Sequence, residues 1–278
     1  MRTPVIRRAA LGLSFLAALA GPARGQSPDN PLLVLTISGG WITGGRMWLL
    51  PRQEETVAGG ALDTVGLERR FRTGVVMGLG AALFRSPHFG YSAELVFLGT
   101  GTESRCFPPA QWSADGNHIN EQACDDIQGQ NVGTSIVALE FGGTWRPIAT
   151  GPVRPYLRLV AGPGYLGGSY VETSGTVAET TVSGTTYYNR SFLDEPHHRT
   201  WTWVVTLGGG VTLRMSPDAQ LRFEARDVVT NLPVVTGPSS PPPATTPTQV
   251  TGKTFHLVSF AAGLDILLEQ SARRTRRY

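Results

Sequence analysis

Charged side chains stand at alternate positions of otherwise apolar segments, a spacing that suits ion pairing inside a protein. Arg222 and Glu224 share one face of segment 219–229, and Glu94, Glu140 and Arg158 occupy the equivalent face of three other segments. A buried charge that loses its partner costs about 3–5 kcal/mol, so such groups must satisfy one another. We therefore predict a layer of paired charges formed by Glu94, Glu140, Arg158, Arg222, Glu224 and Asp265.

This charge layer has two interpretations. Glu94, Glu140 and Arg158 would pair on one side of the interior, and the other three residues on the opposite side. The favoured interpretation is a structural core that fills the interior. The alternative is a constriction that conducts ions or is gated by protons.

Residue types used by hydrolases occur, but their spacing does not form a catalytic set. His256 and Ser259 are three residues apart, so a strand would point them to opposite faces. The run 194–198 (Asp-Glu-Pro-His-His) holds protease-like and metal-binding residue types, yet it is expected to be a solvated loop. No Walker loop, G-x-S-x-G or H-E-x-x-H motif is present. We predict no enzyme activity, no catalytic residues, no cofactor and no metal; a lipid-modifying enzyme is the remote alternative.

The two cysteines, Cys106 and Cys124, lie in one polar stretch. An exported chain crosses an oxidising compartment, which favours a disulfide over a metal site shared with His118. Asp125 and Asp126 in the same stretch could bind a divalent cation, or could bind lipopolysaccharide through a bridging cation. The favoured interpretation is a solvated acidic loop.

The first 25 residues have the pattern of a secretory signal peptide. Three arginines precede an apolar run from Ala9 to Ala20, and small residues follow at positions 21–25. Twelve apolar residues are too few for a spanning helix, which needs about 20. Four of the chain's arginines belong to this leader, so the net charge of +3 becomes nearly neutral in the mature chain. Nothing in that balance indicates a nucleic-acid partner.

The rest of the chain alternates apolar and polar residues in long runs that are typical of β-strands. The longest example, Arg199 to Arg214, exceeds the usual globular strand of about 5–6 residues and could cross a bilayer as a tilted strand. We predict strands at 32–42, 71–85, 89–102, 131–146, 153–170, 199–214, 219–229 and 254–268.

The connections between these strands alternate in length. Those at 86–88, 147–152 and 216–218 are short and rich in proline, glycine or serine, whereas 43–70, 103–130, 171–198 and 230–253 are long. Short turns at one end and long loops at the other are typical of outer-membrane barrels. The prediction is an all-β, antiparallel up-and-down transmembrane β-barrel with eight strands, or ten if 43–70 holds a further hairpin.

The apolar face is expected to point toward lipid. The opposite face carries few charges, and the chain's single lysine, Lys253, lies in a loop. Aromatic residues near the strand ends fit the two membrane interfaces: Trp41, Trp145, Trp201 and Trp203. A soluble barrel with the apolar face inside is the alternative.

The final strand, Phe255 to Leu268, ends in Gly263, Ile266 and Leu268, which looks like the terminal signal of outer-membrane barrels. With the strand count and the loop alternation, the chain resembles the small eight-stranded OmpA, OmpX and OmpW barrels over residues 31–268. The resemblance implies a bacterial outer-membrane barrel at 26–268, followed by a basic periplasmic tail at 269–278. The implied partners are outer-membrane lipid, lipopolysaccharide and the barrel-assembly machinery, and a monomer suffices.

We expect a structural or surface-interaction role for this barrel, without catalysis. The alternative is a narrow channel for small or hydrophobic solutes. Glycines on the inward face would leave room for such a channel: Gly74, Gly78, Gly80, Gly162, Gly164, Gly208 and Gly210.

Overall fold

The computed structural model describes residues 33–56, 62–109, 118–167, 172–193, 201–231, 235–236, 249–250 and 254–268. The expected signal peptide, the basic tail at 269–278 and the run 194–198 lie outside these residues.

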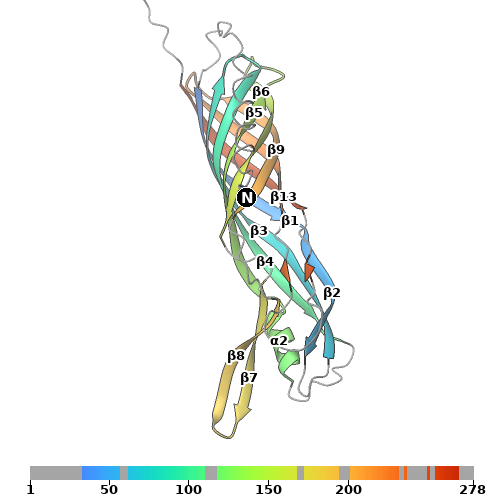
Figure 1. Ribbon diagram of the computed structural model, residues 1–278. Helices are drawn as coiled ribbons and strands as arrows, with labels where there is room; N and C mark the ends of the chain where they lie inside the picture. Colours follow the sequence, from blue (N-terminus) through green and yellow to red (C-terminus); the bar gives the residue numbers. More distant parts are fainter. Residues whose placement is uncertain are drawn as a thin grey trace, which may run out of the picture.

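Eight antiparallel strands form a closed ring (Figure 1). In ring order they are β1 (Leu33–Gly44), β3 (Leu62–Phe84), β4 (Phe89–Phe107), β5 (Asn131–Trp145), β6 (Val153–Leu166), β9 (Trp201–Arg214), β10 (Ala219–Asn231) and β13 (Thr254–Leu268). The first strand closes the ring by pairing with β13 on one side and β3 on the other. The predicted eight-stranded, up-and-down barrel is confirmed.

The first long connection does contain a further hairpin. Strand β2 (Arg46–Thr56) pairs with the first part of β3, from Leu62 to Arg70, beyond the end of the ring. The ring keeps eight strands because β1 pairs directly with β3 from Leu33 to Ile42. The ten-strand alternative is therefore wrong for the ring, although the hairpin that it required exists.

The end of the barrel with the long connections is called the loop end, and the end with the short connections is called the turn end. Further elements lie at the loop end. Helix α2 (Ile119–Ile127) lies there, beside the hairpin of β7 (Thr173–Thr181) and β8 (Gly184–Leu193), which projects away from the ring (Figure 1). Two short strands, β11 (Val235–Thr236) and β12 (Gln249–Val250), pair with each other.

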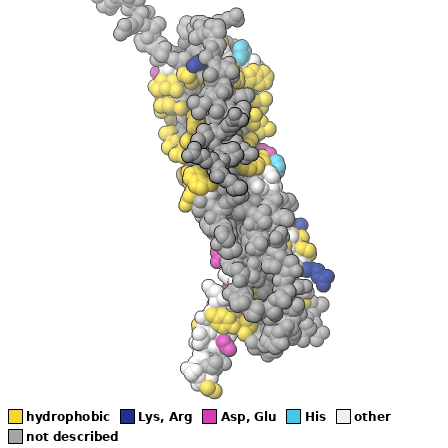
Figure 2. Space-filling view, viewed as in Figure 1, with side chains coloured by type: hydrophobic (Ala, Val, Ile, Leu, Met, Phe, Trp, Pro, Cys, Tyr) yellow, Lys and Arg dark blue, Asp and Glu magenta, His cyan; other side chains and the backbone are white. Residues whose placement is uncertain are grey.

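Side chains of the ring strands largely alternate between an exposed outer face and a buried inner face, most regularly on β13. On β13 exposed Val258, Phe260 and Leu264 alternate with buried Leu257, Ser259 and Asp265. The exposed hydrophobic side chains form a band over the upper part of the barrel in Figure 2. An apolar exterior of this kind is what a bilayer-spanning barrel presents to lipid. None of the described helices is long and apolar enough to cross a membrane.

Candidate functional site

The interior of the barrel contains a buried cluster of charges near the turn end. Glu94 on β4 accepts hydrogen bonds from Arg158 on β6 and, at 3.0 Å, from Arg226 on β10. The same two arginines approach Glu224 on β10, at 3.1 Å and 3.2 Å. Two carboxylates and two guanidinium groups thus alternate in a closed set of four ion pairs across the lumen.

A second carboxylate site adjoins this set. Asp265 on β13 accepts two parallel hydrogen bonds from Arg222, of 2.9 Å and 3.1 Å, which is the bidentate geometry that guanidinium groups favour. Thr36 and Gln220 each donate a further bond of 2.7 Å to the same carboxylate. Hydrogen bonds from three side chains therefore satisfy Asp265 although it is fully buried.

Tyr156 on β6 links the two parts of the cluster. Its hydroxyl donates a 2.9 Å bond to Glu224, and its ring lies 4.9 Å from the guanidinium carbon of Arg222. Arg222 itself is 3.8 Å from Glu224. The expected division of the charges into two separate groups on opposite sides of the interior is therefore wrong. Arg158 reaches across the lumen to Glu224, and Glu224 also lies near Arg222. Arg226 and Tyr156 were missing from the predicted layer, although both share the inward face with members of it.

Glu140 differs from the other predicted members of the layer. It lies directly opposite Glu94 in the β4–β5 register, so two carboxylates face each other there. Its Oε1 accepts a 2.6 Å bond from Thr206, and its Oε2 has no hydrogen-bond partner. Among the described residues no cation forms an ion pair with Glu140, so it borders the network without joining it.

The space beside the inward glycines next to the cluster is occupied by side chains. A Cβ at Gly78 would overlap Glu94 Oε1, and one at Gly208 would overlap Glu224 Oε1. These glycines supply the space into which the two carboxylates fold. They are not evidence for an open lumen, contrary to the sequence-based argument for a channel.

An apolar plug fills the barrel from the cluster to the loop end. Its inward side chains include Ile42, Val76, Leu98, Ile136, Val204, Val228 and Leu257, each at most 2% exposed. The same hydrophobic cluster continues beyond the ring through Trp48 and Leu67 to α2 and the β7–β8 hairpin. Four further buried residues close the turn end: Val34, Ala82, Phe84 and Leu267.

The outward face of β13 carries a histidine–carboxylate pair that the sequence did not suggest. His256 Nδ1 lies 2.8 Å from Asp227 of β10, and both side chains are exposed. Ser259 points into the barrel and is fully buried. The prediction that His256 and Ser259 occupy opposite faces thus agrees with the structure. Ser259 therefore cannot act as a nucleophile beside the exposed His256–Asp227 pair.

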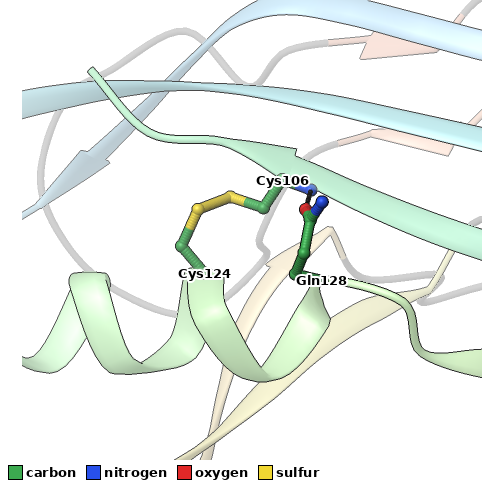
Figure 3. Close-up of a disulfide and its surroundings, with 3 residues drawn as sticks. All are labelled: Cys106, Cys124 and Gln128. Carbon is green, nitrogen blue, oxygen red and sulfur yellow. Dashed lines mark hydrogen bonds between the residues drawn. A yellow bond between two sulfur atoms is a disulfide. The ribbon is translucent and has the colours of Figure 1, made fainter. Parts of the chain in front are cut away.

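Cys106 and Cys124 form a disulfide that ties α2 to β4 (Figure 3). Gln128, just after the helix, accepts a 3.1 Å bond from the backbone N–H of Cys106. The helix side chains Gln122 and Asp126 accept backbone N–H bonds from β7. His118 pairs with Glu121, and the described residues contain no group of ligands able to hold a metal ion.

The four predicted interface tryptophans all lie on the outer face. Trp41 stacks near Phe260 with ring centroids 6.2 Å apart, and Trp201 meets Tyr165 edge-on at 5.6 Å. Trp145 and Trp203 are likewise exposed.

The closed antiparallel ring, its apolar exterior and its charged, filled interior define the class: this is a small transmembrane β-barrel of the outer-membrane type. No family model and no curated protein sequence matches the chain.

Three solved structures show similar folds at low sequence identity. OprG from Pseudomonas aeruginosa is 10% identical, with 86% of this chain and 98% of that one covered and a TM-score of 0.43. Neisserial surface protein A is 9% identical (85% and 96% covered, TM-score 0.37). The outer-membrane protease OmpT from Escherichia coli is 11% identical (86% and 97% covered, TM-score 0.36).

Proposed function

We propose that this protein is a closed, non-enzymatic barrel that acts through its surface beyond the membrane and through its lipid contacts, not as a pore. The observation that carries the proposal is the continuous filling of the lumen. The ion cluster occupies the turn-end half, and side chains such as Ile42, Leu98 and Ile136 fill the loop-end half. An eight-stranded ring is just wide enough for side chains to fill.

The absence of catalysis is part of the same proposal. The exposed Asp227–His256 pair could orient and polarise a nucleophile, but the serine nearest in sequence points to the opposite face. Most of the buried carboxylates and guanidinium groups form ion pairs with one another, so they are unsuited to proton transfer with a substrate.

Single-channel recordings in planar bilayers test this proposal. The folded wild-type barrel is expected to show no stable openings, and neither is Leu159→Ala, a matched control whose side chain points outward from β6. Arg158→Ala removes ion pairs to both Glu94 and Glu224, so openings in this variant alone would place the seal at the cluster. Stable wild-type openings would overturn the proposal.

The second candidate function is a narrow passage for hydrophobic solutes. The apolar character of the loop-end lumen favours it over an ion channel. Uptake of a hydrophobic fluorophore into vesicles that contain the wild-type barrel, above the rate for empty vesicles and faster still with Arg158→Ala, would support it.

A further inference from the structure

The outer face beyond the apolar band carries four arginines at the loop end, which we call the outer arginine patch: Arg46, Arg70, Arg72 and Arg105. In the strand register Arg46 lies opposite Arg70, and Arg70 lies opposite Glu103. Side chains of directly paired residues share one face of a sheet. The patch therefore continues, on the same face, the surface that points to lipid nearer the turn end, and Arg side chains are visible beyond the apolar band in Figure 2.

The register also sets the height of the patch above the membrane band. Trp41 pairs with Val75, and Val75 pairs with Gly99 at the outer edge of the apolar band. Arg72 lies opposite Gly101 and Arg70 opposite Glu103, so they stand two and four β4 residues further out. At about 3.3 Å per residue and a tilt of ~40°, these offsets are roughly 5 and 10 Å along the membrane normal.

Lipid headgroups occupy about 5–7 Å beyond the hydrocarbon on each side of a bilayer. The patch thus begins in the headgroup layer and extends just above it, where the phosphate groups of an outer-leaflet glycolipid would lie.

A buried carboxylate organises the centre of the patch. Glu68 is 3% exposed, and its Oε1 accepts Nε–H bonds from Arg46 at 2.6 Å and from Arg70 at 2.8 Å. Burial raises the pKa of Glu68, but the hydrogen bonds from Arg70 and Arg46 outweigh burial and hold that pKa below its ordinary value. Two arginines directly opposite each other would repel, and this shared carboxylate offsets the repulsion.

The arrangement leaves positive charge facing outward. Arg46 and Arg70 are 51% and 44% exposed, and their Nε atoms are already engaged, so the outer edge of each guanidinium is presented to solvent. Arg72 is positioned by Asn131, and Arg105 is paired with Glu103. Four arginines therefore face two carboxylates, and the patch has a net positive charge.

We infer that the outer arginine patch binds the phosphate groups of a phosphorylated outer-leaflet glycolipid, that is, lipopolysaccharide. The planar guanidinium fork matches phosphate geometry, and a guanidinium held by Glu68 loses less side-chain entropy when it binds. The interaction is direct and needs no bridging cation. It depends on the outer-membrane placement in the proposed function, but not on whether the lumen conducts.

The test is a titration of full-length barrel, in nanodiscs of zwitterionic lipid, with fluorescent lipopolysaccharide. The double variant Arg46→Gln/Arg70→Gln is expected to bind about tenfold more weakly or worse than the wild type. The matched control is Arg85→Gln/Arg214→Gln, which removes two exposed arginines at the turn end and should bind as the wild type does. Dephosphorylated lipopolysaccharide should bind the wild type as weakly as the intact lipid binds the double variant.

Two results would overturn the inference. One is equal binding by the double variant and the wild type, both folded. The other is displacement of lipopolysaccharide by inorganic phosphate or a sulfated polysaccharide at similar concentrations, which would mark a site for soluble anions. If the double variant does not fold, Arg72→Gln leaves Glu68 and its partners intact and should still weaken binding, by about threefold. Conductance in the bilayer experiment would refute the closed-barrel proposal and leave this titration unaffected.

Discussion

At the scale of single residues, the two facing carboxylates Glu94 and Glu140 make opposite contributions. Glu94 joins two arginines, whereas Glu140 has only Thr206 as a hydrogen-bond partner. Glu94→Gln should lower the free energy of unfolding by about 3 kcal/mol or more, because two buried arginines each lose an ion pair. Glu140→Gln keeps the acceptor for Thr206 and removes a repulsive charge, so its effect should stay within about 1 kcal/mol or be stabilising.

Urea unfolding in lipid vesicles, followed by tryptophan fluorescence, measures both variants. Equal losses for Glu94→Gln and Glu140→Gln would show that Glu140 is a full member of the ion network.

The sequence predicts which charges face inward, but not which of them pair. Alternation along a strand sets the face of each side chain, so Glu94, Arg158 and Asp265 could be assigned to the interior. Partner choice depends on the stagger between strands and on side-chain reach across the lumen, and neither is encoded locally. Arg226 carries the same signal as Glu224, two positions earlier, and could have been included. Tyr156 could not, since an aromatic residue on the inward face is equally consistent with plain packing.

Glu68 provides a pH-dependent prediction. Because its folded pKa lies below the ordinary value of 4.5, its contribution to stability is complete well above that value and is lost as the pH falls through the lowered pKa. The difference in unfolding free energy between wild type and Glu68→Gln should therefore be constant near neutral pH and shrink at pH values below about 4.5. Paired unfolding curves at several pH values measure this difference. A difference that grows on acidification would contradict the assignment.

At the scale of elements, sequence patterns distinguish strands from turns reliably. They do not distinguish a strand segment inside the membrane from one that continues beyond it. The range 43–70 was expected to be an external connection, yet it forms β2 and the first part of β3. Inward residues such as Met47 and Leu67 are fully buried there, because the hydrophobic cluster extends past the ring. Apolar and polar residues alternate both in the membrane-spanning part of the strands and beyond it. The membrane boundary is indicated in the sequence only by the change from apolar to charged residues on the outer face.

The disulfide should control the order of the loop-end elements without controlling the barrel. Cys106 and Cys124 are 18 residues apart, and closing a loop of about that length is worth ~3 kcal/mol in the chain-entropy model. In Cys106→Ser/Cys124→Ser, α2 should detach more readily and release the β7–β8 hairpin that it contacts. Hydrogen exchange should show faster exchange in both elements and unchanged protection in β10 and β13. Unchanged exchange in α2 would show that its bonds to β7 suffice.

At the scale of the whole molecule, the curvature of so small a ring depends on glycines that the sequence alone presents as spare volume. Close approach of neighbouring strands requires the absence of a Cβ at Gly40, where one would overlap the carbonyl oxygen of Phe260 and lie 2.7 Å from the Cα of Ala261. Glycine in a strand commonly marks such a bend or close backbone approach. This position lies on β1, where the ring closes against β13.

Gly39 and Gly40 therefore form a matched pair for testing how the barrel closes. Gly40→Ala must push β1 and β13 apart at the closing seam, so it should cost about 1–3 kcal/mol and slow or prevent folding into vesicles. At the adjacent Gly39 a Cβ would come no nearer than 3.9 Å to any atom, so Gly39→Ala should fold as the wild type does. Folding yield, measured by the heat-dependent electrophoretic mobility of the barrel, compares the two variants directly. Equal yields would mean that the seam can relax around a methyl group, and that closure of the ring does not depend on the contact at Gly40.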